Sequence, residues 1–271
     1  MSRQEAFPPV MILCGGRGTR LRDVTEVLPK PMVPIGGQPI LWHIMRSFAA
    51  FGARRFILCL GYKREVFVDY FMNGALRSTD ATITLGREPA VVFHEDPVVE
   101  GWEVTLAGTG LETLTGGRVW QAARYLRPDD REFFLSYGDG LADIDLMALL
   151  RCHRNGGAAL TVSAVHPETR FGELSLADDR VTAFAEKPAQ TGGYINGGYM
   201  VLDRRFIDDY LAPDPAAALE REPMARAAAA GDMRAYRHEG FWQCMDNQRE
   251  YLLLNEIWGS GQAPWTRYWD K

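Results

Sequence analysis

VMILCGG, from Val10 to Gly16, is the stretch of the sequence that decides the fold. Five consecutive apolar residues halted by two glycines are typical of a fully buried strand in a parallel sheet. A helix is predicted between Pro39 and Gly52, because apolar residues recur there at helical spacing. A second apolar strand is predicted over 56–60. This order of strand, helix and strand predicts a βαβ unit with a right-handed crossover.

The same alternation returns further along the chain. Helices are predicted around 119–126 and 146–150, and buried strands over 133–137 and 160–165. More strands are predicted at 173–176, 181–185 and 199–202, and Ala-rich helices around 204–211 and 224–230. Alternating strands and helices predict an α/β fold, namely a Rossmann-like, mostly parallel, twisted sheet with helices on both faces.

Two segments depart from this alternation. Between about 62 and 115 short apolar pieces such as 91–93 and 103–106 alternate with charged and small residues, which predicts an inserted small β-rich region. From about 204 onward the pattern predicts a C-terminal helical part. We expect all of residues 1–271 to form a single domain.

The composition excludes several classes of protein. Thirty Lys and Arg against 35 Asp and Glu give a net charge of −5, whereas nucleic-acid-binding domains are usually strongly basic. The four cysteines are too few and too scattered for a disulfide framework or a CxxC metal site. The apolar stretch from Val10 is too short for a signal peptide, and no run approaches the roughly 18 apolar residues of a membrane span. We therefore expect a cytoplasmic protein with no nucleic-acid or membrane partner.

The loop GGRGTRL, from Gly15 to Leu21, directly follows the first predicted strand. Its backbone N–H groups can surround an anion, and Arg17 and Arg20 add two cations, which favours a polyphosphate ligand over a simple strand-to-helix turn. The dinucleotide fingerprint fails, because Leu21 replaces its third glycine and no acidic residue lies about 20 positions on. A P-loop is excluded too, because the chain contains no Gly-Lys pair.

Two further charged residues lie where the backbone is constrained. Lys30 is flanked by Pro29 and Pro31, and a lysine held so stiffly indicates a substrate contact more than a solvated surface charge. Asp139 lies between two glycines and follows the predicted strand 133–137. A carboxylate at the end of such a strand can hold Mg²⁺ over a phosphate, although an Asp between glycines also commonly forms a turn.

Six motifs, taken together and in this order, resemble those of the sugar-1-phosphate nucleotidyltransferases. They are GGRGTRL (15–21), LPKPM (28–32), GGQPI (36–40), GD (138–139), EKP (186–188) and NGG (196–198). Within that family the chain most resembles the cytidylyltransferases that act on glucose 1-phosphate, through ILWHIM (40–45), LGYK (60–63), TGGR (115–118), YGDG (137–140), RFG (170–172), GFWQ (240–243) and APW (263–265). The resemblance covers about residues 10 to 269.

The resemblance implies a role for each matching residue. Nucleotide contacts are implied for Leu13, Gly15, Gly16, Gly18, Thr19, Arg118, Tyr137 and Gly138. Contacts to the sugar phosphate are implied for Gly172, Glu186, Lys187 and Asn196. The implied catalytic residues are Arg20, Lys30, Asp139 and Lys187, and Asp139 and Asp246 match the carboxylate pair that coordinates Mg²⁺. A homo-oligomer is also implied, with the C-terminal part from about 204 taking part in sugar binding and oligomerisation.

The implied reaction suits these residue types. An oxygen of the sugar 1-phosphate, already anionic, attacks the α-phosphorus of CTP in line with the departing pyrophosphate, so no strong general base is needed. The main difficulty is to bring two polyanions together, and cations, backbone N–H groups and Mg²⁺ do this by positioning and charge neutralisation. Arginine offers a flat fork for bidentate phosphate contacts, whereas lysine is a mobile point charge.

Three alternatives remain beside this interpretation. The nucleotide could be dTTP or UTP, because cytosine and uracil differ in one exocyclic group that backbone atoms can distinguish. A non-catalytic sugar-nucleotide sensor is opposed by the presence of Arg20, Lys30, Asp139 and Lys187. A dinucleotide-dependent oxidoreductase is opposed by the missing third glycine and the missing ribose carboxylate.

A few positions depart from the family pattern. Cys244 and Asn247 replace a more usual Pro and Thr, and an acidic residue often found before Thr109 is missing. These positions are expected near the sugar or a subunit contact, so the acceptor sugar is the open part of the interpretation. Trp265 and Trp269 are expected to pack on a neighbouring subunit, because an exposed aromatic tail is a liability.

Overall fold

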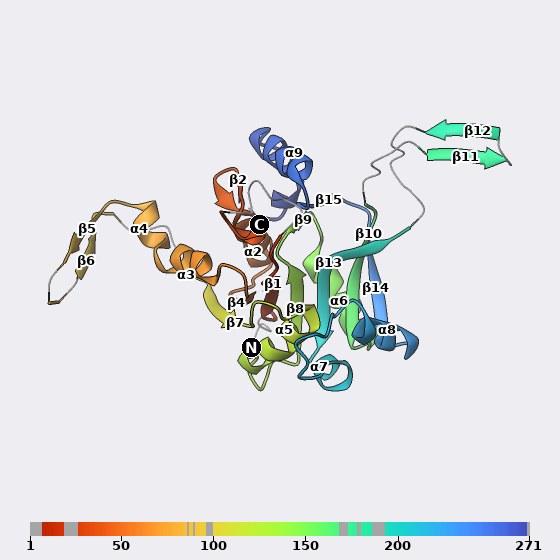
Figure 1. The fold of residues 1–271 in the computed structure, drawn as a ribbon, viewed down its shortest axis with the longest axis horizontal. Helices are drawn as coiled ribbons and strands as arrows, with labels where there is room; N and C mark the ends of the chain where they lie inside the picture. Colours follow the sequence, from red (N-terminus) through yellow and green to blue (C-terminus); the bar gives the residue numbers. More distant parts are fainter. Residues whose placement is uncertain are drawn as a thin grey trace, which may run out of the picture.

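The computed structural model describes residues 7–18, 27–85, 87–88, 90–95, 100–167, 173–177, 180–185 and 193–269, with the backbone alone for 173–177 and 180–185. These residues form a seven-stranded central sheet with helices on both faces (Figure 1). In spatial order its strands are β14 (Met233–His238), β10 (Leu160–Val165), β13 (Ile195–Asp203), β8 (Glu132–Tyr137), β1 (Val10–Cys14), β4 (Arg55–Leu60) and β7 (Glu103–Gly108).

The sheet is mostly parallel, as the sequence predicts. The pairs β1/β4, β1/β8, β4/β7 and β10/β14 are parallel, and β13 alone of the seven runs antiparallel to both of its neighbours. The predicted Rossmann-like α/β fold is confirmed. Because β13 is reversed, its first residues lie at the same end of the sheet as the last residues of β8.

The position of β1 explains its continuous apolar sequence. It is hydrogen-bonded to β4 on one side and to β8 on the other, and all five of its residues are buried. Val10 and Ile12 face one hydrophobic cluster, whereas Met11 and Leu13 face the other. A strand covered on both faces needs apolar residues at every position, and not only at alternate ones.

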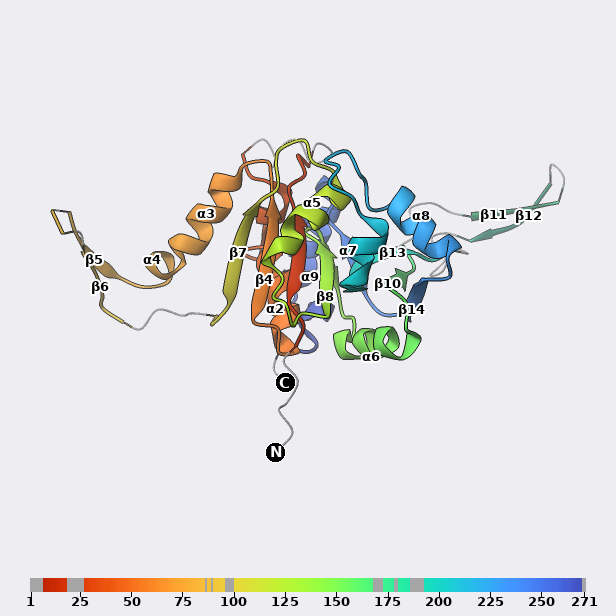
Figure 2. The same ribbon diagram turned by 90° about the horizontal axis from the view of Figure 1, so that it is seen from below.

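The two faces are covered by different helices. The face of Val10 packs against α2 (Ile40–Ala50), α6 (Leu146–Gly156) and α9 (Gln248–Gly259). The face of Met11 packs against α5 (Thr115–Ala122), α7 (Arg205–Tyr210) and α8 (Glu222–Ala229), as Figure 2 shows for α5 and α7. Helix α2 follows an extended Pro39 and is ended by Gly52, whose φ is 103°, in agreement with the predicted limits.

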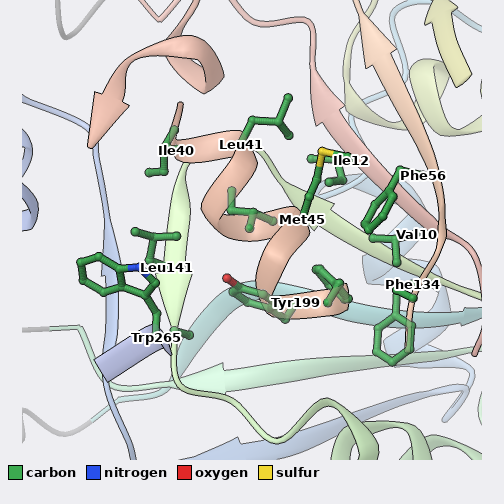
Figure 3. Packing of buried hydrophobic residues seen from close by; sticks show 14 of the residues in the cluster. Val10, Ile12, Ile40, Leu41, Met45, Phe56, Phe134, Leu141, Tyr199 and Trp265 are labelled. Carbon is green, nitrogen blue, oxygen red and sulfur yellow. The ribbon is translucent and has the colours of Figure 1, made fainter. Parts of the chain in front are cut away.

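The interior beneath α2 is closely packed (Figure 3). Ile40 and Met45 are fully buried there, together with Phe134 of β8 and Tyr199 of β13. Burial of one such side chain stabilises the fold by about 1.5–3 kcal/mol. The helix and the strands that carry the site are thereby held in a fixed relation.

The two C-terminal tryptophans pack within their own chain. Trp265 is 1% exposed, and its ring centroid lies 6.0 Å from that of His43. Trp269 lies 5.7 Å from His43, and its Nε1 donates a 3.2 Å hydrogen bond to Ser47 Oγ. The prediction that these residues pack on a neighbouring subunit is therefore wrong for Trp265, and Trp269 belongs to the same intrachain cluster.

Part of the predicted insertion projects from the sheet. Helices α3 (Arg64–Met72) and α4 (Gly74–Ser78) lead to a hairpin of β5 (Ala81–Thr84) and β6 (Ala90–Phe93), far from the centre in both Figure 1 and Figure 2. Strand β7, which lies within the same 62–115 segment, instead pairs with β4 along its whole length. As an edge strand it is only partly buried, so its apolar pattern is weak.

Smaller elements complete the fold around the site. The C-terminal part contributes β14 to the sheet and β15 (Trp242–Cys244), which pairs with β9 (Gly140–Ala142). The remaining elements are β2 (Pro34–Ile35), β3 (Gln38–Pro39), β11 (Glu173–Ala177), β12 (Arg180–Ala185) and the 3-10 helices η1 (Lys30–Met32), η2 (Ala123–Tyr125) and η3 (Pro264–Thr266). Of the helices in the described ranges, none has both the length and the apolar composition to cross a membrane.

Candidate active site

A pocket of about 560 Å³ lies at the carboxyl ends of β1 and β8. Its lining includes ten residues for which the sequence predicts a role: Leu13, Gly15, Gly16, Gly18, Lys30, Arg118, Tyr137, Gly138, Asp139 and Asp246. The carboxyl edge of a parallel sheet is the usual location of ligand sites in α/β folds. The structure thus brings most of the predicted residues together.

The other predicted residues have different positions. Thr19, Arg20, Gly172, Glu186 and Lys187 lie outside the described residues. Asn196, near the start of β13, reaches the pocket edge through a contact with Tyr137. A second pocket, of about 370 Å³ between α5 and α7, contains none of the predicted site residues.

The floor of the pocket is a partly buried cation between two carboxylates. Lys30 Nζ donates hydrogen bonds to Asp139 Oδ2 at 2.6 Å and to Asp246 Oδ1 at 2.5 Å. The Lys30 side chain is 12% exposed, and those of Asp139 and Asp246 are 31% and 26% exposed. Burial alone lowers the pKa of Lys30, but the charges and hydrogen bonds of Asp139 and Asp246 outweigh it and raise this pKa above its ordinary value.

The proline pair positions Lys30 through a tight turn. The N–H of Met32 donates to the carbonyl of Pro29 at 2.8 Å, which closes the 3-10 turn that begins at Lys30. Pro31 packs so closely on Gly138 that a Cβ there would lie 2.9 Å from Pro31 Cγ. A glycine is therefore required before Asp139, because a side chain there would collide with Pro31 and with the carbonyl oxygen of Leu13.

Asp246 reaches the floor through the pairing of β9 and β15. The N–H of Met245 donates to the carbonyl of Asp139 at 2.8 Å, which joins the two aspartate segments directly. Glu250 Oε2 accepts from the N–H of Asp246 at 2.5 Å, and Asn247 and Glu250 form a capping box at the start of α9. Asn247 therefore caps α9, as a Thr at this position also could, so the departure from the family pattern is compatible with this turn.

Asp139 and Asp246 fit a divalent cation. Carboxylate oxygens are the ligands that Mg²⁺ prefers, and the Lys30 ammonium shows that the two carboxylates already converge on one positive charge. Within the part of the chain that the structure describes, no three or more His, Cys, Asp or Glu side chains form a group suited to a metal ion. Mg²⁺ commonly binds one or two carboxylates together with substrate phosphates, which agrees with a donor set of two.

Arg118 forms one wall of the pocket. Its side chain is buried, and Nη1 donates to Thr109 Oγ1 at 2.7 Å and to the carbonyl of Gly110 at 2.8 Å. Nη2 donates to the carbonyls of Gly15 and Leu111, each at 3.2 Å. A Cβ on Gly15 would lie 2.0 Å from Nη1, so the first glycine of the loop is required by this arginine. Arg118 thus joins the glycine loop to the chain after β7.

Tyr137 connects Glu220 to Asn196. Its hydroxyl donates to Glu220 Oε1 at 2.6 Å and accepts from Asn196 Nδ2 at 3.3 Å. Burial and the charge of Glu220 raise the pKa of Tyr137, so the hydroxyl keeps its proton. Trp242 Nε1 donates to the carbonyl of Gly197 at 2.7 Å, which also holds the start of β13.

Sequence reasoning missed part of the pocket. Thr113, Leu114 and Thr115 at the start of α5, Trp242 and Cys244 also line it. The stretches TGGR and GFWQ could have indicated two of these residues, whereas Glu220 lies in a loop without any motif. Burial and the Glu250 carboxylate raise the pKa of the Cys244 thiol to about 12, so this thiol remains protonated and is a poor nucleophile.

Comparison with known proteins identifies the family. A family model described as Nucleotidyl transferase matches residues 9–257. The chain belongs to the nucleotidyl transferase family. This match covers the glycine loop, the Pro-Lys-Pro turn, both aspartates of the pocket floor and Asn196 at the start of β13. The resemblance that the motifs indicate is thereby confirmed.

Individual members of the nucleotidyl transferase family are similar over nearly the whole chain. A glucose-1-phosphate cytidylyltransferase of Salmonella typhimurium is 44% identical over 255 residues, which is 94% of this chain and 97% of the relative. A probable glucose-1-phosphate cytidylyltransferase of Bacillus subtilis is 40% identical over 94% of this chain and 98% of the relative. Among solved structures, HddC from Yersinia pseudotuberculosis has a TM-score of 0.64 at 25% identity, and the match covers 93% of this chain and 100% of HddC.

Proposed function

We propose that this nucleotidyl transferase transfers the cytidylyl group of CTP to glucose 1-phosphate, forming CDP-glucose and pyrophosphate. The observation that carries the proposal is the convergence of Asp139 and Asp246 on Lys30 beneath the glycine loop. Such a floor is suited to joining two phosphate-bearing substrates. The relatives in Salmonella and Bacillus, which bear the name of this activity and match over nearly their full length, support the choice of nucleotide and sugar.

The proposed reaction is a single in-line displacement. An anionic phosphate oxygen of glucose 1-phosphate forms a bond to the α-phosphorus of CTP, and the bond from that phosphorus to pyrophosphate breaks. No proton needs to be removed from the attacking oxygen. Lys30 neutralises phosphate charge as a point cation, while the backbone of Gly15 and Gly16 orients the triphosphate.

Asp139 and Asp246 are the residues we propose to hold Mg²⁺. When bound, the ion neutralises phosphate charge and orients the phosphate oxygens. Lys30 supplies the positive charge between the same carboxylates in the structure. The proposed roles of Arg20 at the triphosphate, and of Gly172, Glu186 and Lys187 at the sugar phosphate, rest on the family resemblance.

We also propose a homo-oligomer in the cytoplasm. The β5/β6 hairpin carries apolar side chains that are largely exposed, among them Ile83 at 53% and Val92 at 58%, with Leu85 at 88% just after β5. A two-stranded hairpin is marginally stable by itself, so cover from a second copy of the chain would stabilise it. The four cysteines are free thiols, which agrees with a reducing compartment.

A substrate matrix tests the proposed function. Purified protein with Mg²⁺ and glucose 1-phosphate is given CTP, UTP, dTTP, ATP or GTP, and pyrophosphate release is measured. We expect CTP to exceed UTP by at least about tenfold in kcat/KM, because an acceptor aimed at the cytosine amino group would face the uracil carbonyl and go unsatisfied. A preference for dTTP or UTP would assign another nucleotide. Inactivity with every nucleotide on glucose 1-phosphate, and again when other sugar 1-phosphates are supplied, would favour the sensor alternative.

A further inference from the structure

Residues 214–220, between α7 and α8, lie directly on the N-terminal end of α5. The N–H of Leu114 donates to the carbonyl of Pro215 at 2.8 Å, and the N–H of Gly117 donates to that of Ala217 at 3.1 Å. A Cβ on Gly117 would lie 2.7 Å from a backbone oxygen of this segment. The glycines of the TGGR stretch thus allow the segment to approach at backbone distance, and its last residue, Glu220, reaches the pocket edge.

Both carboxylate oxygens of Glu220 bind hydroxyls of pocket-lining residues. Oε1 accepts from Tyr137 Oη and Oε2 accepts from Thr115 Oγ1, each at 2.6 Å. An ionised carboxylate can only accept, so both hydroxyl protons must point toward it. Hydrogen bonds to a charged acceptor are also the strong ones. The donor direction of Tyr137 is thereby set by Glu220.

The direction of the Tyr137 proton also determines how Asn196 contacts this hydroxyl. With its proton committed to Glu220, Tyr137 Oη presents a lone pair, and Asn196 Nδ2 donates to it at 3.3 Å. Asn196 Oδ1 accepts from the N–H of Gly198 at 2.9 Å, so the amide is oriented from both ends. The amide nitrogen carries two hydrogens, and one of them is directed at Tyr137. The second can donate to an oxygen of a ligand.

Building on the proposed function, we propose that Glu220 is a positioning residue for the acceptor. Through Tyr137 it holds Asn196 with an N–H directed at a hydroxyl oxygen of the sugar 1-phosphate. Glu220 itself touches neither substrate. This role predicts an effect confined to the sugar phosphate, and specifically to the one hydroxyl that Asn196 recognises. A merely structural role, holding residues 214–220 in place, would instead affect all substrates alike.

The experiment combines variants of the protein with variants of the acceptor. Glucose 1-phosphate and its monodeoxy analogues are compared at saturating CTP for the wild type, Glu220→Ala and Glu220→Gln. In the wild type we expect one analogue to lose about tenfold in kcat/KM. In Glu220→Ala we expect the KM for glucose 1-phosphate to rise about tenfold, whereas kcat and the KM for CTP should change less than about threefold. The penalty for that analogue should disappear.

The conservative variant, one further variant and a control make the test specific. Glu220→Gln retains an oxygen that can accept from Tyr137, so it should restore most of the penalty. Tyr137→Phe keeps the ring and removes the hydroxyl, so it should lose the penalty as Glu220→Ala does, and it decides the question if Glu220→Ala fails to fold. Glu222→Ala changes an exposed carboxylate on the adjoining helix and should match the wild type.

The outcomes separate this inference from the proposed function. Absence of CDP-glucose formation by the wild-type chain would refute the proposed function. Two results would overturn the role of Glu220 while CDP-glucose formation by the wild type still stood. One is an unchanged penalty for the deoxy analogue in Glu220→Ala and Tyr137→Phe. The other is an equal loss with every acceptor and with CTP. Loss of the penalty in both variants and its return in Glu220→Gln supports the role.

Discussion

The floor and the wall of the pocket each contain a cation, partly buried on the floor and buried on the wall, and the two are held in opposite ways. Lys30 is bound by two carboxylates, whereas Arg118 is bound by backbone carbonyls and one hydroxyl. On the floor, one positive charge against two negative charges leaves a net charge of −1 that favours a further cation. On the wall the hydrogen-bond partners are neutral, so they do not offset the charge of the guanidinium.

This difference indicates two kinds of function for buried cations. A lysine shared between carboxylates can exchange those partners for phosphates when substrates and the proposed Mg²⁺ bind, because an ammonium is a mobile point charge. A guanidinium whose planar fork is engaged by fixed backbone atoms cannot leave without breaking several buried hydrogen bonds. We therefore expect changes on the floor to abolish turnover and changes on the wall to lower stability first.

The largest effect is expected for Lys30→Met. The variant should fold, yet kcat should fall roughly 1000-fold, because the mobile positive charge between the two phosphate-bearing substrates is removed. Pyrophosphate release gives the rate, and circular dichroism confirms the fold. Arg226→Met on the exposed side of α8 is a matched control that should keep wild-type turnover. Near wild-type turnover in Lys30→Met would contradict the expectation that changes on the floor abolish turnover.

Loss of either carboxylate should have the next largest effect. Asp139→Asn and Asp246→Asn each remove one negative charge from the floor, so turnover should fall at least about 100-fold and need more Mg²⁺ for half its maximum. The measurement is a rate against Mg²⁺ concentration, with the exposed Asp209→Asn as control. If either variant matches the wild type at limiting Mg²⁺, that residue is not a metal ligand.

On the wall, Arg118→Met should lower the free energy of unfolding by about 2–4 kcal/mol, because it leaves buried carbonyls without donors. Urea denaturation measures this, and Lys30→Met should show a smaller change, since its partner carboxylates are partly exposed and can be hydrated. Unchanged stability combined with lost turnover would instead make Arg118 a direct substrate contact.

His43 provides the smallest and most selective test, because it is a buried group held in its neutral form. Burial lowers the pKa of His43 to about 4, although its hydrogen bond with the carbonyl of Ile35 opposes this. The unfolded chain, with a histidine pKa near 6.5, then binds more protons below about pH 6.5. Stability from this group is therefore full above that pH and is lost as pH falls toward 4, by about 2 kcal/mol at pH 5.

The measurement for His43 is urea denaturation between pH 7 and pH 5. The difference between the wild type and His43→Gln should shrink as the pH falls, because only the wild type loses this contribution. A difference that stays constant over this range would mean that the ring is charged or hydrated inside the fold.

The centre of the fold could be predicted from the sequence, and its edges only partly. Strand β1 and helix α2 are buried enough for their apolar patterns to be continuous or strictly periodic. Strands β7 and β14 lie at the two edges of the sheet and are partly exposed, so their residues show little pattern. Hydrophobic periodicity arises from burial, and an edge strand shows a weaker pattern because less of it is buried.

The candidate site divides in a similar way. The motifs indicate Gly15, Lys30 and Asp139, because glycines and prolines constrain the backbone locally and leave a visible signature. Glu220 has no such signature, since its place depends on how residues 214–220 lie against α5. The family resemblance assigned Arg118 to the nucleotide side, but the hydrogen bonds to the glycine loop are visible only in the folded chain.

By itself, the sequence determined the central βαβ unit and the membership of the family, because each depends on residues close together in the chain. The tertiary structure alone decided which partner each charge has. Asp246 joins Lys30 and Asp139 because β15 pairs with β9, and Arg118 meets the glycine loop because α5 packs against β1 and β4. Hydrogen bonds require atoms about 3 Å apart with the right direction. Local sequence cannot specify that geometry between distant segments, and packing of the whole chain does.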